Sequence, residues 1–208
     1  MERPLTSGEA EKFMNNVTRR GFIFGGATIA AYGLLIGVQR ACVAALSYDN
    51  PPEGVPGSVR IVKFADNGSR QGVLTVARII KTKDDWKKQL TSLQYDVTRR
   101  AATEYAFSGT LDHQFAAGLY RCIDCDNALF DSASKFDSGT GWPSFWQPIA
   151  PENVYEKTDA SFGTIRREVK CTLCDAHLGH VFGDGPAPTG QRYCMNSAAL
   201  RFLPRSAS

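Results

Sequence analysis

The stretch that decides the fold is CTLCDAHLGHVFGDG, residues 171–185. It begins with Cys171 and Cys174, and a second pair with the same spacing, Cys122 and Cys125, stands far upstream. A gap of two residues lets one tight turn bring both sulfurs of a pair to one cation, and two such turns make a tetrahedral tetrathiolate. Thiolate ligands favour zinc, or iron where iron is available. We therefore predict a metal site that joins two distant segments.

The metal is expected to be one structural Zn²⁺ per chain, because four protein ligands leave no open coordination position for catalysis. Its binding free energy would stabilise the fold. The alternative is a pair of redox-active dithiols of the thioredoxin type, which lie at the start of a helix in a βαβ unit. Both pairs here stand beside β-like sequence and are followed by Asp126 or Asp175. The metal is therefore the favoured interpretation.

The sequence around the two pairs is short-segmented and β-like. The segments GLYRC, GTIRREVKC, HLGHVF and YCMNSAALRFL are separated by clusters of Gly, Pro, Asp and Asn. Few segments are long enough for a helix. We predict a mainly β (α+β) domain over residues 93–204, with antiparallel strands and short helices near its start.

Residues 46–92 are predicted to hold a linker, a β-hairpin and a short helix. Pro and Gly dominate residues 47–58, which show no periodicity and are therefore interpreted as a linker. Two apolar-rich segments then flank Asn67 and Gly68, a dipeptide that favours a tight turn between antiparallel strands.

A short amphipathic helix is predicted over residues 81–95, KTKDDWKKQLTSLQY. Trp86, Leu90 and Leu93 have the i, i+4, i+7 spacing of one helical face. Asp84 is placed to cap the start of this helix.

Residues 1–45 are predicted to be an export signal or a membrane anchor. Arg19 and Arg20 precede an uncharged, Gly- and Ala-rich run at 21–38, which resembles a twin-arginine export signal. The alternative is a permanent anchor, since the run approaches the roughly 20 residues that cross a bilayer. Lipid modification of Cys42 is a third option, which the preceding arginine disfavours. We expect export to the periplasm, an oxidising compartment.

The charge of the chain gives no indication of a nucleic-acid partner. The whole sequence has a formal net charge of +3, and its first 45 residues hold five basic and three acidic residues. The rest of the chain is therefore nearly neutral with mixed signs, unlike the basic surface that binds nucleic acid.

Cys194 is the one cysteine left free once the pairs bind metal and the leader is set aside. Buried structural cysteines are common, but Arg192 and Asn196 each stand two positions away, on the same face if this segment is a strand. A nearby cation lowers the pKa of a thiol, and the thiolate is the nucleophile. His177 and His180, two of three histidines, could supply the second half of a Cys–His arrangement.

Three long segments resemble the type-B methionine sulfoxide reductases, which reduce the R epimer at sulfur. They are FDSGTGWPSFW, CDAHLGHVFGDGP and PTGQRYCMNSAALRF, and both cysteine pairs match as well. The similarity covers residues 93–203. It implies two curled antiparallel sheets, a structural zinc on the side away from the active site, and a thioredoxin-type electron donor.

The resemblance also implies a role for each matching residue. Cys194 matches the nucleophile that attacks the sulfoxide sulfur, releases methionine and becomes a sulfenic acid. His180 matches the residue that binds and helps protonate the sulfoxide oxygen, because oxide is a poor leaving group. Three more residues match those that hold this oxygen and tune the thiolate: His177, Arg192 and Asn196. Trp142 matches the indole that receives the S-methyl group, and Phe182 is assigned to the same substrate-binding set.

Thr140 is the informative departure from the family. Many members carry a resolving cysteine in SGCGWPSF, where this chain reads SGTGWPSF. Threonine cannot form a disulfide, so we expect an external thiol, such as a thioredoxin-like periplasmic protein, to reduce the Cys194 sulfenic acid directly. We expect a monomer that acts on oxidised proteins and also on free methionine sulfoxide. The alternative function is a non-catalytic zinc module that binds another macromolecule.

Overall fold

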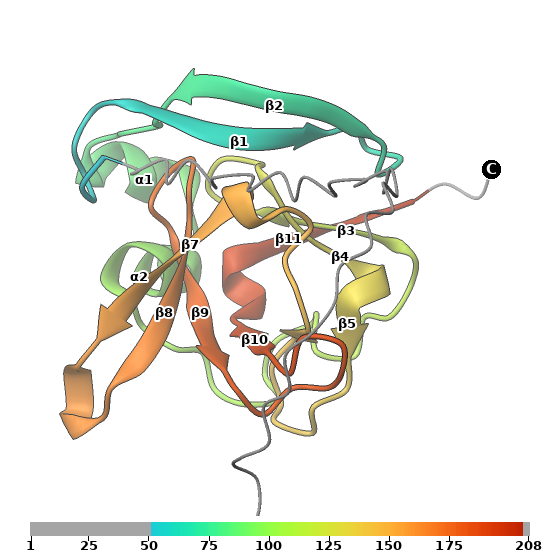
Figure 1. The fold of residues 1–208 in the computed structure, drawn as a ribbon. Coiled ribbons are helices and arrows are strands. Elements are labelled where there is room, and N and C mark those ends of the chain that lie inside the picture. Colours follow the sequence, from blue (N-terminus) through green and yellow to red (C-terminus); the bar gives the residue numbers. More distant parts are fainter. Residues whose placement is uncertain (1–50, 206–208) are drawn as a thin grey trace, which may run out of the picture. The chain divides into compact units, whose positions relative to one another are not determined.

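The computed structural model describes residues 51–205 (Figure 1). The predicted export signal or anchor at 1–45, with its apolar run 21–38 and Cys42, lies outside the described residues. Within the described part of the chain, every helix is too short or too polar to cross a bilayer.

The strands of the described chain are all antiparallel and form three sheets. The largest sheet has, in spatial order, β5 (Lys135–Phe136), β6 (Ser144–Phe145), β10 (Arg192–Met195), β9 (His177–Phe182), β8 (Arg166–Cys171) and β7 (Val154–Asp159). The second sheet has β11 (Leu200–Pro204), β3 (Gly118–Cys122) and β4 (Ala128–Asp131). The third is the hairpin of β1 (Ser58–Phe64) and β2 (Arg70–Ala77). The prediction of a mainly β fold with antiparallel sheets is confirmed.

The helices of residues 51–205 are few and short. Two α-helices lie in this part of the chain, α1 (Lys83–Gln89) and α2 (Ser92–Arg100). Four single 3₁₀ turns connect strands: η1 (Ser132–Ser134), η2 (Pro151–Asn153), η3 (Ser161–Gly163) and η4 (Ser197–Ala199). Helix α2 packs on β9 and η4, close to the largest sheet (Figure 1).

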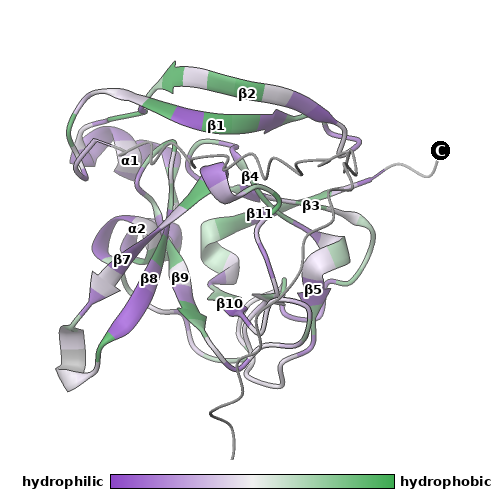
Figure 2. Cartoon of the chain, in the orientation of Figure 1, coloured by the Kyte–Doolittle hydropathy of each residue, from purple (hydrophilic) through white to green (hydrophobic). Residues whose placement is uncertain are grey.

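The core between the two larger sheets is aromatic and buried. The rings of Phe130 and Phe145 stack with centroids 4.4 Å apart, and Tyr120 meets Phe145 edge-on at 4.8 Å. Leu178 and Met195, from β9 and β10, are fully buried beside them. Apolar residues appear along β1 and β9 in Figure 2, whereas α1 and α2 are mostly polar. Burial of these side chains holds the sheets together.

The segment YCMNSAALRFL forms two strands in different sheets. Its first part belongs to β10, and the turn η4 then redirects the chain into β11. Leu200 at the start of β11 pairs with Cys122 at the end of β3. One short segment thus links the strand of Cys194 to the first cysteine pair.

The prediction of a single helix over residues 81–95 is wrong, because the chain forms two helices there. Thr82, rather than Asp84, caps α1 by accepting a hydrogen bond from the Asp85 amide at 3.2 Å. Thr91 then starts α2 through a capping box with Gln94, in which each side chain accepts from the other residue's backbone amide. A strong N-cap signal inside the apolar pattern interrupts the first helix.

The break changes which apolar residues are buried. Trp86 and Leu90 lie in the core, but Leu93 falls in the new helix and is 54% exposed. The predicted hairpin is confirmed, with Ser58 opposite Ala77. Its strand β1 is anchored by the Asn153 side chain, which accepts from the amide of Val62 and donates to the carbonyl of Val62.

Candidate active site and metal site

The four paired cysteines converge on one point. The sulfur atoms of Cys122, Cys125, Cys171 and Cys174 lie within 4.8 Å of one another. Cys122 Sγ is 3.7 Å from Cys174 Sγ, and Cys125 Sγ is 3.6 Å from Cys171 Sγ. A tetrahedral Zn²⁺ site with Zn–S bonds of 2.3 Å requires sulfurs about 3.8 Å apart. These four cysteines could therefore hold a metal ion.

Both CxxC turns have the same backbone geometry. Each ends in an aspartate in the left-handed region, Asp126 with φ 64° and Asp175 with φ 58°. The amides of these aspartates donate to the carbonyls of Cys122 and Cys171, each at 2.9 Å. Aspartate tolerates this conformation better than most residues, which accounts for its place after both pairs. The pairs lie in β-hairpins, not at helix starts as in a thioredoxin dithiol.

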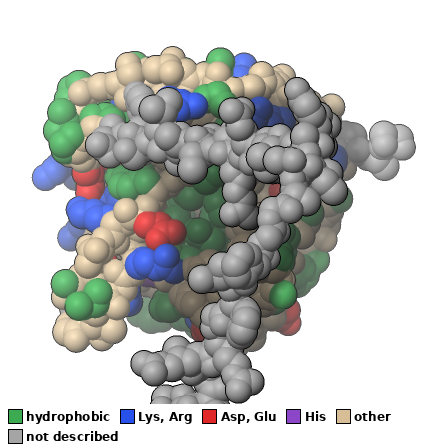
Figure 3. All heavy atoms as spheres, viewed as in Figure 1, with side chains coloured by type: hydrophobic (Ala, Val, Ile, Leu, Met, Phe, Trp, Pro, Cys, Tyr) green, Lys and Arg blue, Asp and Glu red, His purple; other side chains and the backbone are tan. Residues whose placement is uncertain are grey.

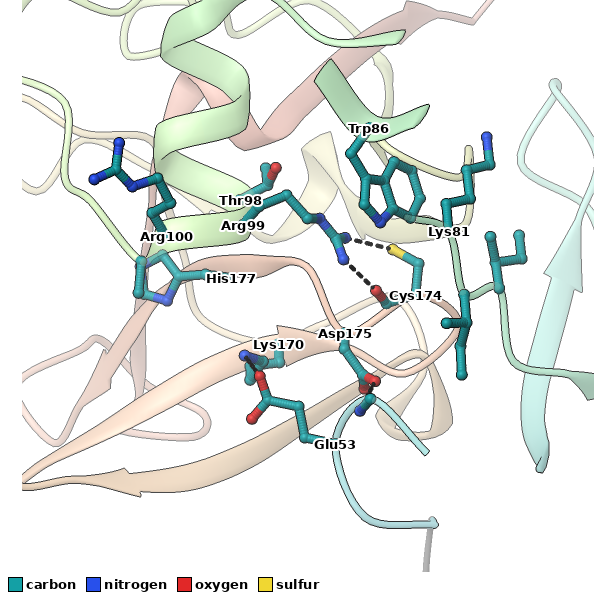
Figure 4. A pocket seen from close by; sticks show the side chains of 14 residues that line it. Glu53, Lys81, Trp86, Thr98, Arg99, Arg100, Lys170, Cys174, Asp175 and His177 are labelled. Atoms are coloured by element: carbon teal, nitrogen blue, oxygen red, sulfur yellow. Dashed lines mark hydrogen bonds and ion pairs between the residues drawn. The ribbon is translucent and has the colours of Figure 1, made fainter. Parts of the chain in front are cut away.

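Arg99, in the last turn of α2, brings positive charge to the sulfurs. Its guanidinium donates to Cys174 Sγ at 3.5 Å and to the Cys174 carbonyl at 2.8 Å. It also bonds Asp124 and lies over the Trp86 ring at 4.2 Å (Figure 4). A metal tetrathiolate carries a net negative charge, which a buried arginine offsets.

Cys194 lies in a separate cavity of about 140 Å³. Strand β10 is paired on both sides, so that Cys194 stands opposite His180 on β9 and opposite Ser144 on β6. Side chains directly opposite on paired strands share one face of the sheet. The lining residues are Thr103, Trp142, Arg166, Gly179, His180, Phe182, Cys194, Met195 and Asn196.

Five of the seven active-site residues predicted from the sequence therefore line one cavity, but His177 and Arg192 do not. The absence of a side chain at Gly179 lets β9 and β10 approach each other closely beside the cavity. A Cβ atom at Gly179 would lie 2.1 Å from the Cys194 carbonyl oxygen. Only glycine fits there.

Burial raises the pKa of the Cys194 thiol above its ordinary value. Arg192 and the hydroxyls of Thr140 and Ser144 act in the opposite direction but do not outweigh burial. Thr140 Oγ1 lies 4.0 Å from the sulfur, and Ser138 Oγ lies 2.8 Å from both the Thr140 and the Ser144 hydroxyls. The direction of this shift opposes the predicted thiolate, because desolvation disfavours the charged form.

Arg192 is fixed beside the cavity rather than in it. Its guanidinium makes two hydrogen bonds to Asp184, at 2.9 and 2.8 Å, and lies 4.5 Å above the Phe182 ring. A carboxylate that accepts from two nitrogens on one edge of the guanidinium fixes its plane. Arg192 therefore acts on the thiol as a stationary charge.

His180 is held by an acidic partner. Its Nε2 lies 2.9 Å from Asp159 Oδ2, and the same oxygen accepts from Arg166 at 2.7 Å. Burial lowers the pKa of His180, with the Asp159 hydrogen bond acting in the opposite direction. Hydrogen bonds from Ser161, and then from His180, hold the pKa of Asp159 well below its usual range. The lowered pKa favours the neutral ring, and the Asp159 contact favours a proton on Nε2, which leaves Nδ1 unprotonated.

His177 lies behind His180, not in the Cys194 cavity. Its side chain is 2% exposed, its Nδ1 is 2.7 Å from Glu168 Oε1, and its ring centroid is 5.4 Å from that of His180. It lines another cavity, of about 350 Å³, next to the metal site. An irregularity in the β8–β9 register between Val169 and Lys170 brings His177 to the His180 side.

Glu104 is an important residue that sequence reasoning missed. Its buried carboxylate accepts from the amides of Ser197 and Ala198, at 2.6 and 2.9 Å. Its own amide donates to Asn196 Oδ1 at 3.0 Å, and its carbonyl accepts from Trp142 Nε1 at 3.2 Å. Glu104 thus positions two cavity residues. Its segment has no periodicity or motif spacing that could have indicated this.

Residues 90–204 match the sequence profile of the SelR domain, which is more than half of the chain. The chain belongs to the SelR domain family. It is 55% identical over 125 residues to the peptide methionine sulfoxide reductase MsrB of Herminiimonas arsenicoxydans, which covers 60% of this chain and 91% of the relative. It is 54% identical over 129 residues to the enzyme of the same name from Pseudomonas syringae pv. syringae, covering 62% and 98%.

These similarities confirm the predicted family, and the protein is a methionine sulfoxide reductase. A third relative, the MsrB of Bradyrhizobium diazoefficiens, is 53% identical over 128 residues, which is 62% of this chain and 92% of that enzyme. The region that matches the SelR profile contains both the metal site and the Cys194 cavity.

Proposed function

We propose that this reductase acts on the R epimer of methionine sulfoxide in oxidised proteins, and that Cys194 is its nucleophile. The observation that carries the proposal is the convergence of Cys194, His180, Asn196, Trp142 and Phe182 on one cavity of about 140 Å³. One part of its lining is polar and another is aromatic. Such a cavity suits a group with a polar oxygen and an apolar methyl on one sulfur.

The chemistry follows from the protonation states. Cys194 is a thiol at rest and His180 is neutral with an unprotonated Nδ1, so His180 can take the thiol proton and return it to the sulfoxide oxygen. The Cys194 sulfur attacks the sulfoxide sulfur, and the oxygen is transferred to form a sulfenic acid and methionine. The cysteine is oxidised by two electrons and the substrate is reduced by two.

Regeneration requires an external thiol. Among the described cysteines, Cys194 is the one outside the metal group, and Thr140 stands 4.0 Å from it where a resolving cysteine would be. A first donor thiol displaces water from the sulfenic acid to form a mixed disulfide. A second donor thiol releases Cys194 and leaves an oxidised donor. A thioredoxin-like dithiol protein supplies both thiols.

The metal in this account is one structural Zn²⁺. Cys122, Cys125, Cys171 and Cys174 would hold it, and it would bind two hairpins together. The cavity beside these cysteines and the cavity of Cys194 share no lining residue. This separation supports a metal that stabilises the fold and takes no part in the redox step.

The cellular location is proposed to be the periplasm, with export by the twin-arginine route and a monomeric mature enzyme. Arg19 and Arg20 before the apolar run support export. Replacing both with lysine should keep the full chain in the cytoplasm. Fractionation that finds the double variant exported as efficiently as the natural chain would contradict this route.

The decisive assay uses peptides that carry R- or S-methionine sulfoxide, with dithiothreitol and then thioredoxin as reductant. The natural chain should reduce the R epimer alone with either reductant, and Cys194→Ser should be inactive. Equal activity of Cys194→Ser would remove Cys194 from the mechanism and leave the alternative of a zinc module that binds another macromolecule.

A further inference from the structure

Residues 51–89 precede the matched domain and pack against it. The 129 aligned residues of this chain already cover 98% of the Pseudomonas syringae relative, which leaves little of that enzyme to correspond to this extension. The role proposed here for the extension rests on the proposed function only in treating His180 as an active-site residue.

The extension is fixed on the second CxxC turn. The Gly54 amide donates to Asp175 Oδ2 at 2.9 Å, and Arg78 forms an ion pair with the same oxygen at 3.2 Å. The Ile79 amide donates to the Leu173 carbonyl at 2.8 Å. Since the Arg78 side chain is 1% exposed, this attachment is largely shielded from water. The residue just before Gly54 is therefore held in place.

That residue, Glu53, begins a chain of charges that ends at His177. Glu53 Oε1 lies 2.7 Å from Lys170 Nζ, and Lys170 Nζ lies 3.5 Å from Glu168 Oε1. The same Glu168 oxygen is 2.7 Å from His177 Nδ1. Figure 4 shows Glu53, Lys170 and His177 around one cavity, with the Glu53–Lys170 contact drawn.

Lys170 and His177 thus share one carboxylate oxygen of Glu168. The Lys170 side chain is 7% exposed and that of Glu168 is 11%, so these charges are poorly hydrated and their attraction is strong. Glu53, with a side chain 41% exposed, gives Lys170 a second carboxylate. If the Glu53 charge were removed, Glu168 would be the remaining carboxylate bonded to Lys170.

We propose that Glu53 is a positioning residue for His177. By holding the ammonium group of Lys170, it leaves Glu168 Oε1 free to accept the Nδ1 proton of His177, which fixes that ring and its tautomer. His177 meets the ring of His180 with centroids 5.4 Å apart, so its orientation bears on the residue that lines the Cys194 cavity. The extension therefore contributes to catalysis without touching the substrate.

The test compares Glu53→Gln with the natural full chain by NMR of ¹⁵N-labelled histidine side chains. The natural protein should show His177 protonated at Nδ1. In Glu53→Gln the His177 nitrogen signals should shift or broaden, whereas those of the exposed His113 stay unchanged. The kcat for R-methionine sulfoxide should fall about 2- to 10-fold with little change in KM, as for a lost orienting contact.

A second substitution separates positioning from a general loss of stability. Removing the competing ammonium in Glu53→Gln/Lys170→Gln should return the His177 signals toward those of the natural chain. Asp84→Asn, an exposed change of the same charge on α1, is the control and should leave them unchanged.

His177 signals in Glu53→Gln that match those of the natural chain would overturn the proposal. So would a double variant whose His177 signals are displaced further than in Glu53→Gln alone. Loss of the proposed function would look different, because an active Cys194→Ser protein would leave these NMR results unaffected.

Discussion

The four-cysteine site and the Cys194 cavity both depend on cysteine side chains, but they are assembled differently. In the four-cysteine site, each of two turns with the same backbone hydrogen bond presents two sulfurs, and contacts of 3.6–3.7 Å join sulfurs of different turns. In the cavity, one sulfur meets groups from the three strands β8, β9 and β10 and from the segments of Thr103, Trp142 and Asn196. Each half of the first site is therefore encoded locally and the fold brings the halves together, whereas every part of the second site depends on the fold.

The acidic partners of the two sites differ in the same way. Asp126 and Asp175 serve the metal turns through their backbone conformation, immediately after the cysteines. Asp159 and Glu104 serve the cavity through hydrogen bonds to residues more than 20 positions away. A substitution in the four-cysteine site should therefore lower the stability of the fold, whereas a substitution in the Cys194 cavity should lower the catalytic activity.

The largest expected effect separates these two kinds of failure. Cys171→Ser should lose the metal and destabilise the fold by on the order of 3–5 kcal/mol, because the tetrathiolate contributes directly to folding. The matched change Cys194→Ser should keep stability within about 0.5 kcal/mol and abolish activity. Denaturant unfolding and metal analysis of both proteins measure this. Equal stability of the two variants would contradict the separate structural and catalytic roles of these cysteines.

A second thiol can be introduced next to Cys194. Thr140→Cys should form a disulfide with Cys194 after one turnover, since the flanking Gly139 and Gly141 let the loop close the present 4.0 Å gap to an S–S bond of about 2.05 Å. Thiol titration in denaturant should find two fewer thiols than before turnover, against one fewer in the natural chain. Persistence of a sulfenic acid in Thr140→Cys would show that the loop cannot close.

Glu104→Gln should weaken the support of the cavity. The amide of glutamine is a poorer acceptor than a carboxylate for the Ser197 and Ala198 amides, so stability should fall by about 1–2 kcal/mol. The KM for the R-sulfoxide should rise, because weaker anchoring of the residue 104 side chain lets its backbone shift, and that backbone holds Asn196 and Trp142. Unfolding curves and steady-state kinetics test this, and natural values for both would remove Glu104 from the account.

The smallest effect concerns pH. Because burial raises the pKa of Cys194, its alkylation by iodoacetamide should be slow at pH 7 and should rise through a midpoint above the roughly 8.5 of a free cysteine. Arg192 acts to lower that pKa, so Arg192→Gln should move the midpoint further upward. If the midpoint in the natural chain lay below that of a free cysteine, burial would not control the pKa of Cys194.

The contrast between the sites also explains what the sequence could predict. The spacing of the CxxC pairs was enough to predict that four cysteines converge, and Asn67-Gly68 was enough to predict the hairpin. The helix at 81–95 was mispredicted because Thr91 and Gln94 form a capping box within an apolar pattern that otherwise continues.

The remaining misses arise from contacts between distant segments. The burial that raises the pKa of Cys194 comes from strands on both sides, which the neighbouring Arg192 in the sequence could not reveal. The position of His177 behind His180 depends on an irregular register between β8 and β9. On the face drawn in Figure 3, acidic and basic side chains lie near one another, in keeping with the near-neutral composition.

The most direct test of the proposed chemistry is a single turnover without reductant, in the presence of a sulfenic-acid trap such as dimedone. One sulfur that performs the redox step predicts one methionine released per chain, the trap attached to Cys194 alone, and the four clustered thiols unmodified. Release of two methionines per chain, or modification of Cys122, Cys125, Cys171 or Cys174 with loss of metal, would contradict it.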